Sequence, residues 1–537
     1  MKNLLAACFL YVGVALNGAT YVNPVLHLDF SDPDVCTTPD GKFIMTASSF
    51  GALPGLPLLE SADMVNWRYV AHALEKHPFS TVSPEHGKGV WAPAILYRNG
   101  RYVIYWGDPD RGIYRISAPA VEGPWSEPRL VLAGKGYIDP CPLYDDDGRV
   151  YLVHAFAASR AKMNSVLAVC ELDADETAPI SQEVLVYDGI ADGNFTAEGP
   201  KFYKKDGEYW LFFPAGGVEE GWQVAARSKS PFGPFAARTV LRQGKTGING
   251  PHQGAWVRTA DGEDWFLHFS DRGAYGRIVY LEPMTWDGEG WPVIGNGGEP
   301  VEEWTMPSCA VRGQEESPQT SDTFDTPQIG LQWQMLGKSA QQTLFATPCG
   351  FARLYSTPLA AAGKGSFGKR TNFWRTPNVV VQKFPAPSFS ATMKARICAK
   401  ADGEEAGLAV HGLDWARLGL KAVGDSFDVV YTECFDAENG GGEKSRVLGR
   451  IQAAIVSAGI RSVKASDIWL KVEVKEKNSR PVCVFSWSLD GEAWNACPGT
   501  FIARQGKWIG ATMGFYAVMA PECIDCGWID VDSFMVE

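Results

Sequence analysis

The sequence contains no apolar run long enough to cross a membrane. The apolar segment from residue 4 to residue 16 falls short of the about 18 residues that a membrane-spanning helix requires. It follows the positive charge of Lys2 and precedes the small residues Gly18 and Ala19, which is the pattern of a cleaved signal peptide. We therefore assign residues 1–19 as a signal peptide and expect a secreted or periplasmic protein.

A lipoprotein anchor is the less favoured alternative. The tetrad Leu5-Ala6-Ala7-Cys8 resembles a lipoprotein cleavage box. It leaves only a few apolar residues ahead of it, however, which is too few for the apolar core of a signal peptide.

The chain also lacks an excess of positive charge. It has 49 Lys and Arg against 62 Asp and Glu, a formal net charge of −13. Without a basic run, such a surface repels phosphate backbones, so we exclude nucleic acid as a partner.

Clustered cysteines are missing as well. Of the 12 cysteines, one lies in the predicted signal peptide, and the odd remainder is scattered, unlike a disulfide scaffold. Cys523 and Cys526 form a lone C-x-x-C without a partner pair or a nearby histidine, so we read them as ordinary buried or bridged cysteines and not as a zinc site.

Aromatic residues, in contrast, are plentiful: 19 Trp, 18 Tyr and 27 Phe. Aromatic side chains fill β-rich cores and also stack on the C–H faces of sugars. With 537 residues, the chain is too long for one ordinary core, so we expect two domains.

A turn dipeptide followed by an aromatic and aliphatic strand recurs five times. Asp-Gly and Asn-Gly favour the tight turns that join antiparallel strands. The copies lie roughly 50 to 60 residues apart, a spacing that suits one four-stranded blade per repeat. We therefore predict an all-β, five-bladed β-propeller over residues 20–305. The turns are Asp40-Gly41, Asn99-Gly100, Asp147-Gly148, Asp206-Gly207 and Asp261-Gly262.

The repeat stops after Trp291, and the composition then changes. Residues 306–322 are polar, with Pro, Ser and Gln, and indicate a linker. Alternating strand patterns return beyond it, so we predict a β-sandwich over residues 323–537.

Three carboxylates precede their repeat turns by a similar distance. Asp32, Asp139 and Glu198 lie before the first, third and fourth turns, each beside a proline or a glycine. Equivalent positions of different blades meet at the axis of a propeller, so we expect these side chains to converge. Glycoside hydrolysis needs two carboxyl groups, one that protonates the leaving oxygen and one that activates water or attacks the sugar. A third carboxylate can keep the acid protonated through its like charge and hold it in position.

Around these residues the chain resembles glycoside hydrolase family 43, especially its β-xylosidase and α-L-arabinofuranosidase members. Ser31-Asp32-Pro33-Asp34 resembles the family's first-blade motif, Ile138-Asp139-Pro140 its third-blade segment, and Glu198-Gly199-Pro200 its acid-bearing segment. The resemblance implies an inverting, exo-acting enzyme with Asp32 as the general base, Glu198 as the general acid, and Asp139 as the residue that orients the acid and tunes its pKa.

The same resemblance extends to residues around the sugar and to the second domain. It implies that Phe50, Trp91 and Arg277 contact the sugar, and that His252 reaches the axis, where some members hold a calcium or sodium ion through water. It implies no required cofactor. It also implies a concanavalin A-like, jelly-roll sandwich that contributes a loop to the rim of the active site.

Several points stay open at this stage. Phe156 and Trp222 lie near the ends of repeat strands, where each either lines the pocket or packs a blade. The expected partner is a plant cell-wall oligosaccharide or polysaccharide, with xylose and arabinofuranose equally suitable. Two alternatives remain: a sugar-binding propeller without catalysis, and a fructan-cleaving five-bladed hydrolase, although Ser31 and Asp34 depart from the Asn-Asp-Pro-Asn opening of those enzymes. The sequence leaves the oligomeric state undetermined.

Overall fold

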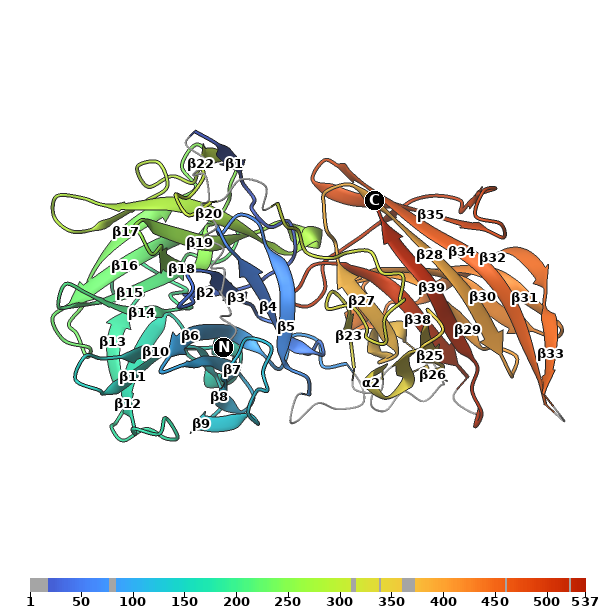
Figure 1. Ribbon diagram of the computed structural model, residues 1–537, viewed down its shortest axis with the longest axis horizontal. Helices are drawn as coiled ribbons and strands as arrows, with labels where there is room; N and C mark the ends of the chain where they lie inside the picture. Colours follow the sequence, from blue (N-terminus) through green and yellow to red (C-terminus); the bar gives the residue numbers. More distant parts are fainter. Residues whose placement is uncertain are drawn as a thin grey trace, which may run out of the picture.

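The computed structural model describes residues 18–76, 84–310, 315–337, 340–359, 372–458, 461–520 and 523–537. Within these ranges the chain is almost wholly β, and a propeller and a sandwich lie side by side (Figure 1). Residues 1–17 of the predicted signal peptide fall outside the described residues. No helix in the described part has the length and apolar character needed to span a membrane.

The first domain is the predicted five-bladed propeller, and each blade is a four-stranded antiparallel sheet with its strands in chain order. The first blade consists of β2 (Asp34–Thr37), β3 (Phe43–Thr46), β4 (Gly55–Ser61) and β5 (Arg68–Leu74). The second consists of β6 (Trp91–Arg98), β7 (Arg101–Asp108), β8 (Gly112–Ala118) and β9 (Arg129–Ala133). The third is β10 (Tyr137–Tyr144), β11 (Val150–Phe156), β12 (Val166–Leu172) and β13 (Val184–Asp188). The fourth consists of β14 (Lys201–Lys205), β15 (Glu208–Ala215), β16 (Trp222–Ser228) and β17 (Ala236–Arg242). The fifth consists of β18 (His252–Arg258), β19 (Asp264–Asp271), β20 (Arg277–Trp286) and β21 (Pro292–Ile294).

The five predicted turn dipeptides join the first and second strands of their blades. Their glycines all have positive φ, between 74° and 96°, which explains why glycine occupies this place in every copy. The second strands read as continuous apolar runs because neighbouring blades bury both of their faces; in β7 every residue after the first is buried.

The first strands of the blades contact one another around the axis. β2 contacts β6 and β18, and β10 contacts β6 and β14. The propeller is also tied at its ends, because β1 (Thr20–Val22) pairs with β22 (Glu303–Thr305). Residues at the starts of the first strands therefore share one central region.

The second domain is a sandwich of two largely antiparallel sheets, as predicted. The eight-stranded sheet has the order β23-β27-β38-β29-β30-β31-β32, with β26 added on β38. Its strands are β23 (Gln334–Met335), β26 (Thr357–Pro358), β27 (Val379–Lys383), β29 (Glu405–His411), β30 (Trp415–Val423), β31 (Ser426–Cys434), β32 (Glu443–Gln452) and β38 (Thr512–Met519).

The nine-stranded sheet has the order β24-β25-β39-β28-β34-β35-β36, with β33 added on β34 and β37 on β35. Its strands are β24 (Leu344–Ala346), β25 (Ala352–Tyr355), β28 (Phe389–Ala399), β33 (Ala454–Ala458), β34 (Arg461–Lys477), β35 (Arg480–Ser488), β36 (Asn495–Ala496), β37 (Phe501–Ile502) and β39 (Trp528–Val536). One large apolar core lies between the two sheets. The described helices of the chain are short: α1 (Ala158–Ala161), α2 (Ala340–Thr343), and the 3-10 turns η1 (Gly273–Tyr275), η2 (Phe373–Arg375) and η3 (Ala437–Asn439).

The two domains pack directly against each other. The His86 ring of the propeller stacks on Trp374 of the sandwich with ring centroids 3.6 Å apart, and Trp374 stacks in turn on His411 at 5.1 Å. Leu53 and Met335 exchange backbone hydrogen bonds of 3.0 and 2.6 Å across the same junction. The position of the sandwich beside the propeller is therefore specified by aromatic stacking and by main-chain pairing.

The eleven cysteines in the described part of the chain all carry free thiols, and most are buried. No group of three or more His, Cys, Asp or Glu side chains converges there in a way that could hold a metal, Cys523 and Cys526 included. Stability therefore comes from packing and hydrogen bonding and not from cross-links.

Candidate active site

Each blade has, just before or within the start of its first strand, a residue in the left-handed region that directly precedes a proline. Asp32, Ala92 and Asp139 hold this conformation although they are not glycine, at a cost on the order of 1–2 kcal/mol each. The five φ angles lie between 37° and 59°. The shared geometry turns the chain at the same level of every blade, and the candidate residues lie at these turns. The five pairs are Asp32-Pro33, Ala92-Pro93, Asp139-Pro140, Gly199-Pro200 and Gly250-Pro251.

The structure brings the three predicted carboxylates within electrostatic reach of one another. Asp32 lies two residues before β2, Asp139 is the third residue of β10, and Glu198 lies three residues before β14. Burial and the neighbouring charges of Glu198 and Asp32 raise the pKa of Asp139 well above its usual range. Three acidic side chains from blades one, three and four thus lie near the starts of their first strands, close enough to influence one another's ionisation.

Glu198 has the properties of a proton donor. Its side chain is 32% exposed, so it is accessible yet poorly solvated. Burial, followed by the negative charge of Asp32, raises its pKa to about 7, while Arg277 opposes the rise. A carboxyl with such a pKa remains protonated in mildly acidic solution, when an ordinary glutamate is ionised.

Asp139 is buried and is bonded to the segment that carries Glu198. The backbone N–H of Gly199 donates a 2.8 Å hydrogen bond to its Oδ2. Only 5% of the residue is exposed, so this contact is shielded from water. Asp139 therefore fixes the chain beside Glu198.

Asp32 is held by Ser48, which lies just after β3, and by Arg277 of β20. The Ser48 hydroxyl donates a 2.6 Å hydrogen bond to its Oδ2 and accepts one of 2.7 Å from the Ala92 N–H. Nη1 of Arg277, the first residue of β20, lies 3.7 Å from Oδ1. These partners leave Asp32 with a defined orientation and a positive charge beside it.

His252 lies at the axis, as the resemblance implies. Its Nε2 is 3.6 Å from Oε1 of Glu198, and both ring nitrogens are buried without a hydrogen-bond partner. Burial, aided by the positive charge of Arg277, lowers its pKa to about 3, so the ring is neutral. A neutral imidazole with a free nitrogen can serve as one ligand of a cation, but the described residues supply no further cluster of protein ligands.

Aromatic side chains from both domains form a row that leads to Arg277. The Phe50 and Trp91 rings meet edge to face with centroids 6.0 Å apart. Trp508 comes from a loop of the sandwich, and its ring centroid lies 6.2 Å from that of Trp91. The guanidinium carbon of Arg277 lies 6.0 Å from the centroid of the Trp508 ring. We call the segment that carries Trp508, residues 504–511, the rim loop.

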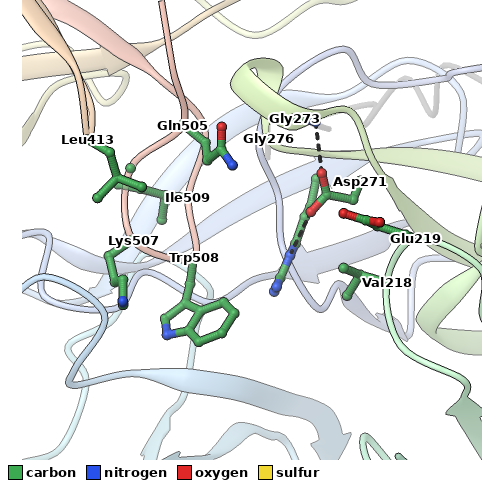
Figure 2. A pocket seen from close by; sticks show the side chains of 12 residues that line it. Val218, Glu219, Asp271, Gly273, Gly276, Leu413, Gln505, Lys507, Trp508 and Ile509 are labelled. Carbon is green, nitrogen blue, oxygen red and sulfur yellow. Dashed lines mark hydrogen bonds and ion pairs between the residues drawn. The ribbon is translucent and has the colours of Figure 1, made fainter. Parts of the chain in front are cut away.

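A cavity of about 280 Å³ lies between the rim loop and the propeller. Figure 2 shows Trp508, Lys507 and Gln505 on its sandwich side and Asp271 and Glu219 on its propeller side. Nε of Arg277 lies 3.9 Å from Oδ2 of Asp271, which links this cavity to the arginine that faces Asp32. Both domains therefore line the space around Arg277.

Phe156 packs within its blade, and Trp222 contacts both its own blade and the segment that joins blades three and four. Phe156 contacts Tyr137 and His154, with ring centroids 5.5 and 5.0 Å apart. Trp222 donates a 2.9 Å hydrogen bond from Nε1 to Asn194 Oδ1, and the Arg242 guanidinium carbon lies 4.4 Å from its ring centroid. No contact described for either ring reaches a carboxylate of the trio; Trp222 instead supports the segment that leads to Glu198.

Sequence reasoning missed a buried ion pair on the axis. Nζ of Lys201 lies 3.2 Å from Oδ1 of Asp34 and donates a 3.0 Å hydrogen bond to the carbonyl oxygen of Pro93. It therefore ties blade four to blades one and two. A signal for it exists in the sequence, because Asp34, Lys201 and His252 each lie two residues after the left-handed position of their blade.

Ser48, Trp508 and Asp271 were also missed. Ser48 belongs to no motif and acts only through contacts with other strands. Trp508 lies in the second domain, more than 200 residues beyond the end of the propeller. No local pattern in the sequence distinguishes such residues from ordinary surface and core positions.

Comparison with known proteins finds matches for both domains. The model of glycosyl hydrolases family 43 matches residues 21–292, and that of the beta xylosidase C-terminal concanavalin A-like domain matches residues 321–537. The chain is similar to a Xylanibacter ruminicola protein that carries the provisional name beta-xylosidase, with 32% identity over 92% of this chain and 86% of the relative. It is also similar to a Bacteroides ovatus protein named non-reducing end alpha-L-arabinofuranosidase, with 29% identity over 77% of this chain and 79% of the relative.

Solved structures show the same two-domain fold. The family 43 protein BlXynB of Bacillus licheniformis superimposes with a TM-score of 0.79 at 24% identity and covers 96% of this chain and 99% of its own. The xylan beta-1,4-xylosidase of Bacillus halodurans gives a TM-score of 0.79 at 21% identity, with 96% and 99% coverage.

Proposed function

The chain belongs to glycosyl hydrolase family 43 and is a glycosidase, and from this premise we propose that it removes terminal xylose or arabinofuranose from hemicellulose oligosaccharides with inversion. In this proposal Glu198 is the general acid, Asp32 the general base, and Asp139 the residue that orients and tunes the acid. The observation that carries it is the group of three carboxylates on the axis, in which Glu198 has its pKa raised to about 7.

Glu198 donates its proton to the oxygen that links the terminal sugar to the rest of the chain. Protonation of this oxygen makes it a better leaving group as positive charge develops on the sugar ring. The raised pKa supplies a protonated carboxyl in mildly acidic solution, and Asp139 keeps it in place through the Gly199 N–H.

Asp32 accepts a proton from the water that attacks the anomeric carbon from the opposite face. Its contacts with Ser48 and Arg277 leave a carboxylate of fixed orientation, as general-base catalysis requires. The proton from water ends on Asp32 and the proton of Glu198 ends on the leaving oxygen, so the next turnover begins when the two carboxyl groups exchange protons with solvent.

The walls of the site support exo action on a small sugar. Phe50 and Trp91 supply aromatic surface, Arg277 supplies hydrogen-bond donors for sugar hydroxyls, and the rim loop with Trp508 borders the site from the second domain. A site bordered in this way accepts the end of an oligosaccharide more readily than its middle. The names of the two relatives, one for xylose and one for arabinofuranose, support both sugars as substrates.

A cation and an export route complete the proposal. His252 would hold a calcium or sodium ion through one neutral nitrogen, with water as its other ligands. The charge and apolar pattern of residues 1–19 supports secretion to the periplasm or the medium.

The test is a panel of nitrophenyl pentosides assayed with the wild type, Asp32→Ala and Glu198→Gln. We expect the wild type to cleave the β-xyloside or the α-L-arabinofuranoside, and Asp32→Ala to lose about 10³-fold in rate on every substrate. Sugar binding without turnover by the wild type would replace this proposal with the non-catalytic, sugar-binding propeller.

A further inference from the structure

Asp29 joins the two domains through a single carboxylate. It lies three residues before Asp32, and only 5% of it is exposed. Its Oδ1 accepts a 2.8 Å hydrogen bond from the backbone N–H of Arg277, and its Oδ2 accepts one of 2.9 Å from the backbone N–H of Gly510 in the rim loop. Its main-chain oxygen accepts a further hydrogen bond from the ammonium group of Lys383 in β27.

The rim loop meets the propeller backbone here without room for a side chain. A Cβ on Gly510 would lie 2.8 Å from the carbonyl carbon of Tyr275 and 2.9 Å from the Gly276 nitrogen. A Cβ on Gly276 would lie 2.5 Å from Cγ of Asp29. The N–H of Ala511 also donates a 2.7 Å hydrogen bond to the Ala274 carbonyl. Close packing and hydrogen bonds thus fix the loop in one position.

The two groups bound by Asp29 both reach the active site. Arg277 places its guanidinium 3.7 Å from Asp32, and it opposes the rise in the pKa of Glu198. The rim loop carries Trp508, which is 48% exposed and whose ring lies 6.2 Å from that of Trp91. One carboxylate therefore fixes the arginine of the first domain relative to the tryptophan of the second.

We propose that Asp29 is a positioning residue for glycoside hydrolysis, which sets Arg277 and Trp508 relative to each other and makes the sandwich a structural part of the sugar site. This inference rests on the proposed function, because it gives Arg277 and Trp508 their roles at that site.

The chemistry of the contact suggests the variant to test. A carboxylate accepts hydrogen bonds on both oxygens, whereas the amide introduced by Asp29→Asn would turn an N–H toward one of the two backbone donors. Asp29→Asn therefore keeps the shape of the side chain but breaks one of the two bonds. Asp63→Asn is the matched control, because Asp63 is 2% exposed and its Oδ1 accepts backbone hydrogen bonds of 2.9 and 2.8 Å from Val65 and Asn66 in a distant turn of blade one.

Kinetics with a nitrophenyl pentoside give the first readout. We expect Asp29→Asn to lower kcat/KM by about 10- to 100-fold, the scale of a small misplacement of catalytic groups. Asp63→Asn should lose similar thermal stability but keep the wild-type kcat/KM. Gly510→Ala, which displaces the rim loop and leaves the carboxylate intact, should reproduce the loss in kcat/KM.

Amide hydrogen exchange gives a second readout that does not depend on activity. Exchange across residues 504–511 should become faster in Asp29→Asn than in the wild type or in Asp63→Asn. Wild-type kinetics and wild-type exchange in Asp29→Asn would overturn the inference, and so would a loss of stability alone. Failure of the proposed function would look different, because the wild type itself would then cleave no pentoside while the exchange result could still be read.

Discussion

The Ser48 hydroxyl donates a 2.6 Å hydrogen bond to Oδ2 of Asp32 and so fixes the position of one carboxylate oxygen of the proposed general base. The same hydroxyl accepts a hydrogen bond from Ala92, in the neighbouring blade. The orientation of Asp32 therefore depends on how blades one and two pack against each other. The catalytic geometry is a property of the assembled propeller and not of the first-blade motif alone.

We expect Ser48→Ala to lower kcat by about 10-fold or more, since a hydrogen bond to a charged group contributes roughly 1.5–3 kcal/mol. Ser49→Ala is the matched control: Ser49 accepts a 3.1 Å hydrogen bond from the Leu56 N–H in the same segment, and no contact with Asp32 is described for it. Steady-state kinetics on a nitrophenyl pentoside and thermal melts of both variants check the prediction. Equal kcat in the two variants would show that Ser48 has only a structural role.

The raised pKa of Glu198 predicts where activity is lost at alkaline pH. The acid must carry its proton, and its pKa is raised to about 7, so kcat/KM should decline as the pH rises through that value. In Glu198→Gln this limb should disappear, because the amide has no proton to lose. A pH profile of kcat/KM for both proteins tests this, and a limb near pH 7 that persists in Glu198→Gln would assign it to another group.

Glu198→Gln should also discriminate between leaving groups. A nitrophenolate leaves with little help, whereas the sugar alkoxide of a xylo-oligosaccharide requires a proton. We therefore expect the variant to lose about 10²-fold or more on the oligosaccharide and considerably less on the aryl glycoside. Parallel assays on the two substrates are sufficient, and equal losses on both would contradict the assignment of the acid.

The buried pair of Lys201 and Asp34 predicts an effect on stability. Lys201 is 1% exposed, and Asp34 has its pKa raised by burial in spite of the nearby lysine. Lys201→Met leaves an unpaired carboxyl on the axis, which costs about 3–5 kcal/mol and should lower Tm by roughly 5–10 °C. The double variant Asp34→Asn with Lys201→Met removes both charges and should recover part of this loss. Thermal melts of the two single variants and the double variant test the coupling, and strictly additive changes in Tm would argue against it.

The fold could be predicted from the sequence because the patterns that indicate it are local. Each Asp-Gly or Asn-Gly turn specifies a hairpin through its positive φ, and the apolar runs that follow form the strands buried between blades. Regular recurrence then converts local hairpins into a propeller. The carboxylate trio was accessible for the same reason, since Asp32, Asp139 and Glu198 share an offset from these turns.

The rest of the site could not be read in this way because it depends on contacts between distant segments. Ser48 acts across two blades, and Asp29 acts across two domains through the backbone of Gly510. Trp508 reaches the site from a loop of the sandwich that has no repeat or motif. Phe156 and Trp222, which share the repeat, were open between pocket and packing, and their contacts lie within their blades and, for Trp222, also with the segment that joins blades three and four.

The stereochemistry of the product tests the role of Asp32 most directly. If Asp32 activates water, the water attacks the face opposite the leaving group, and a β-xyloside should first release α-xylose, which then mutarotates. A proton NMR time course that begins within the first minute of hydrolysis would show this order, with free α-xylose under the same conditions as the control for mutarotation. Initial release of β-xylose would mean that a carboxylate attacks the sugar itself, as in the fructan-cleaving hydrolases. Asp32 would then be a nucleophile, and the contacts of Ser48 and Arg277 would orient it toward the anomeric carbon instead of toward a water molecule.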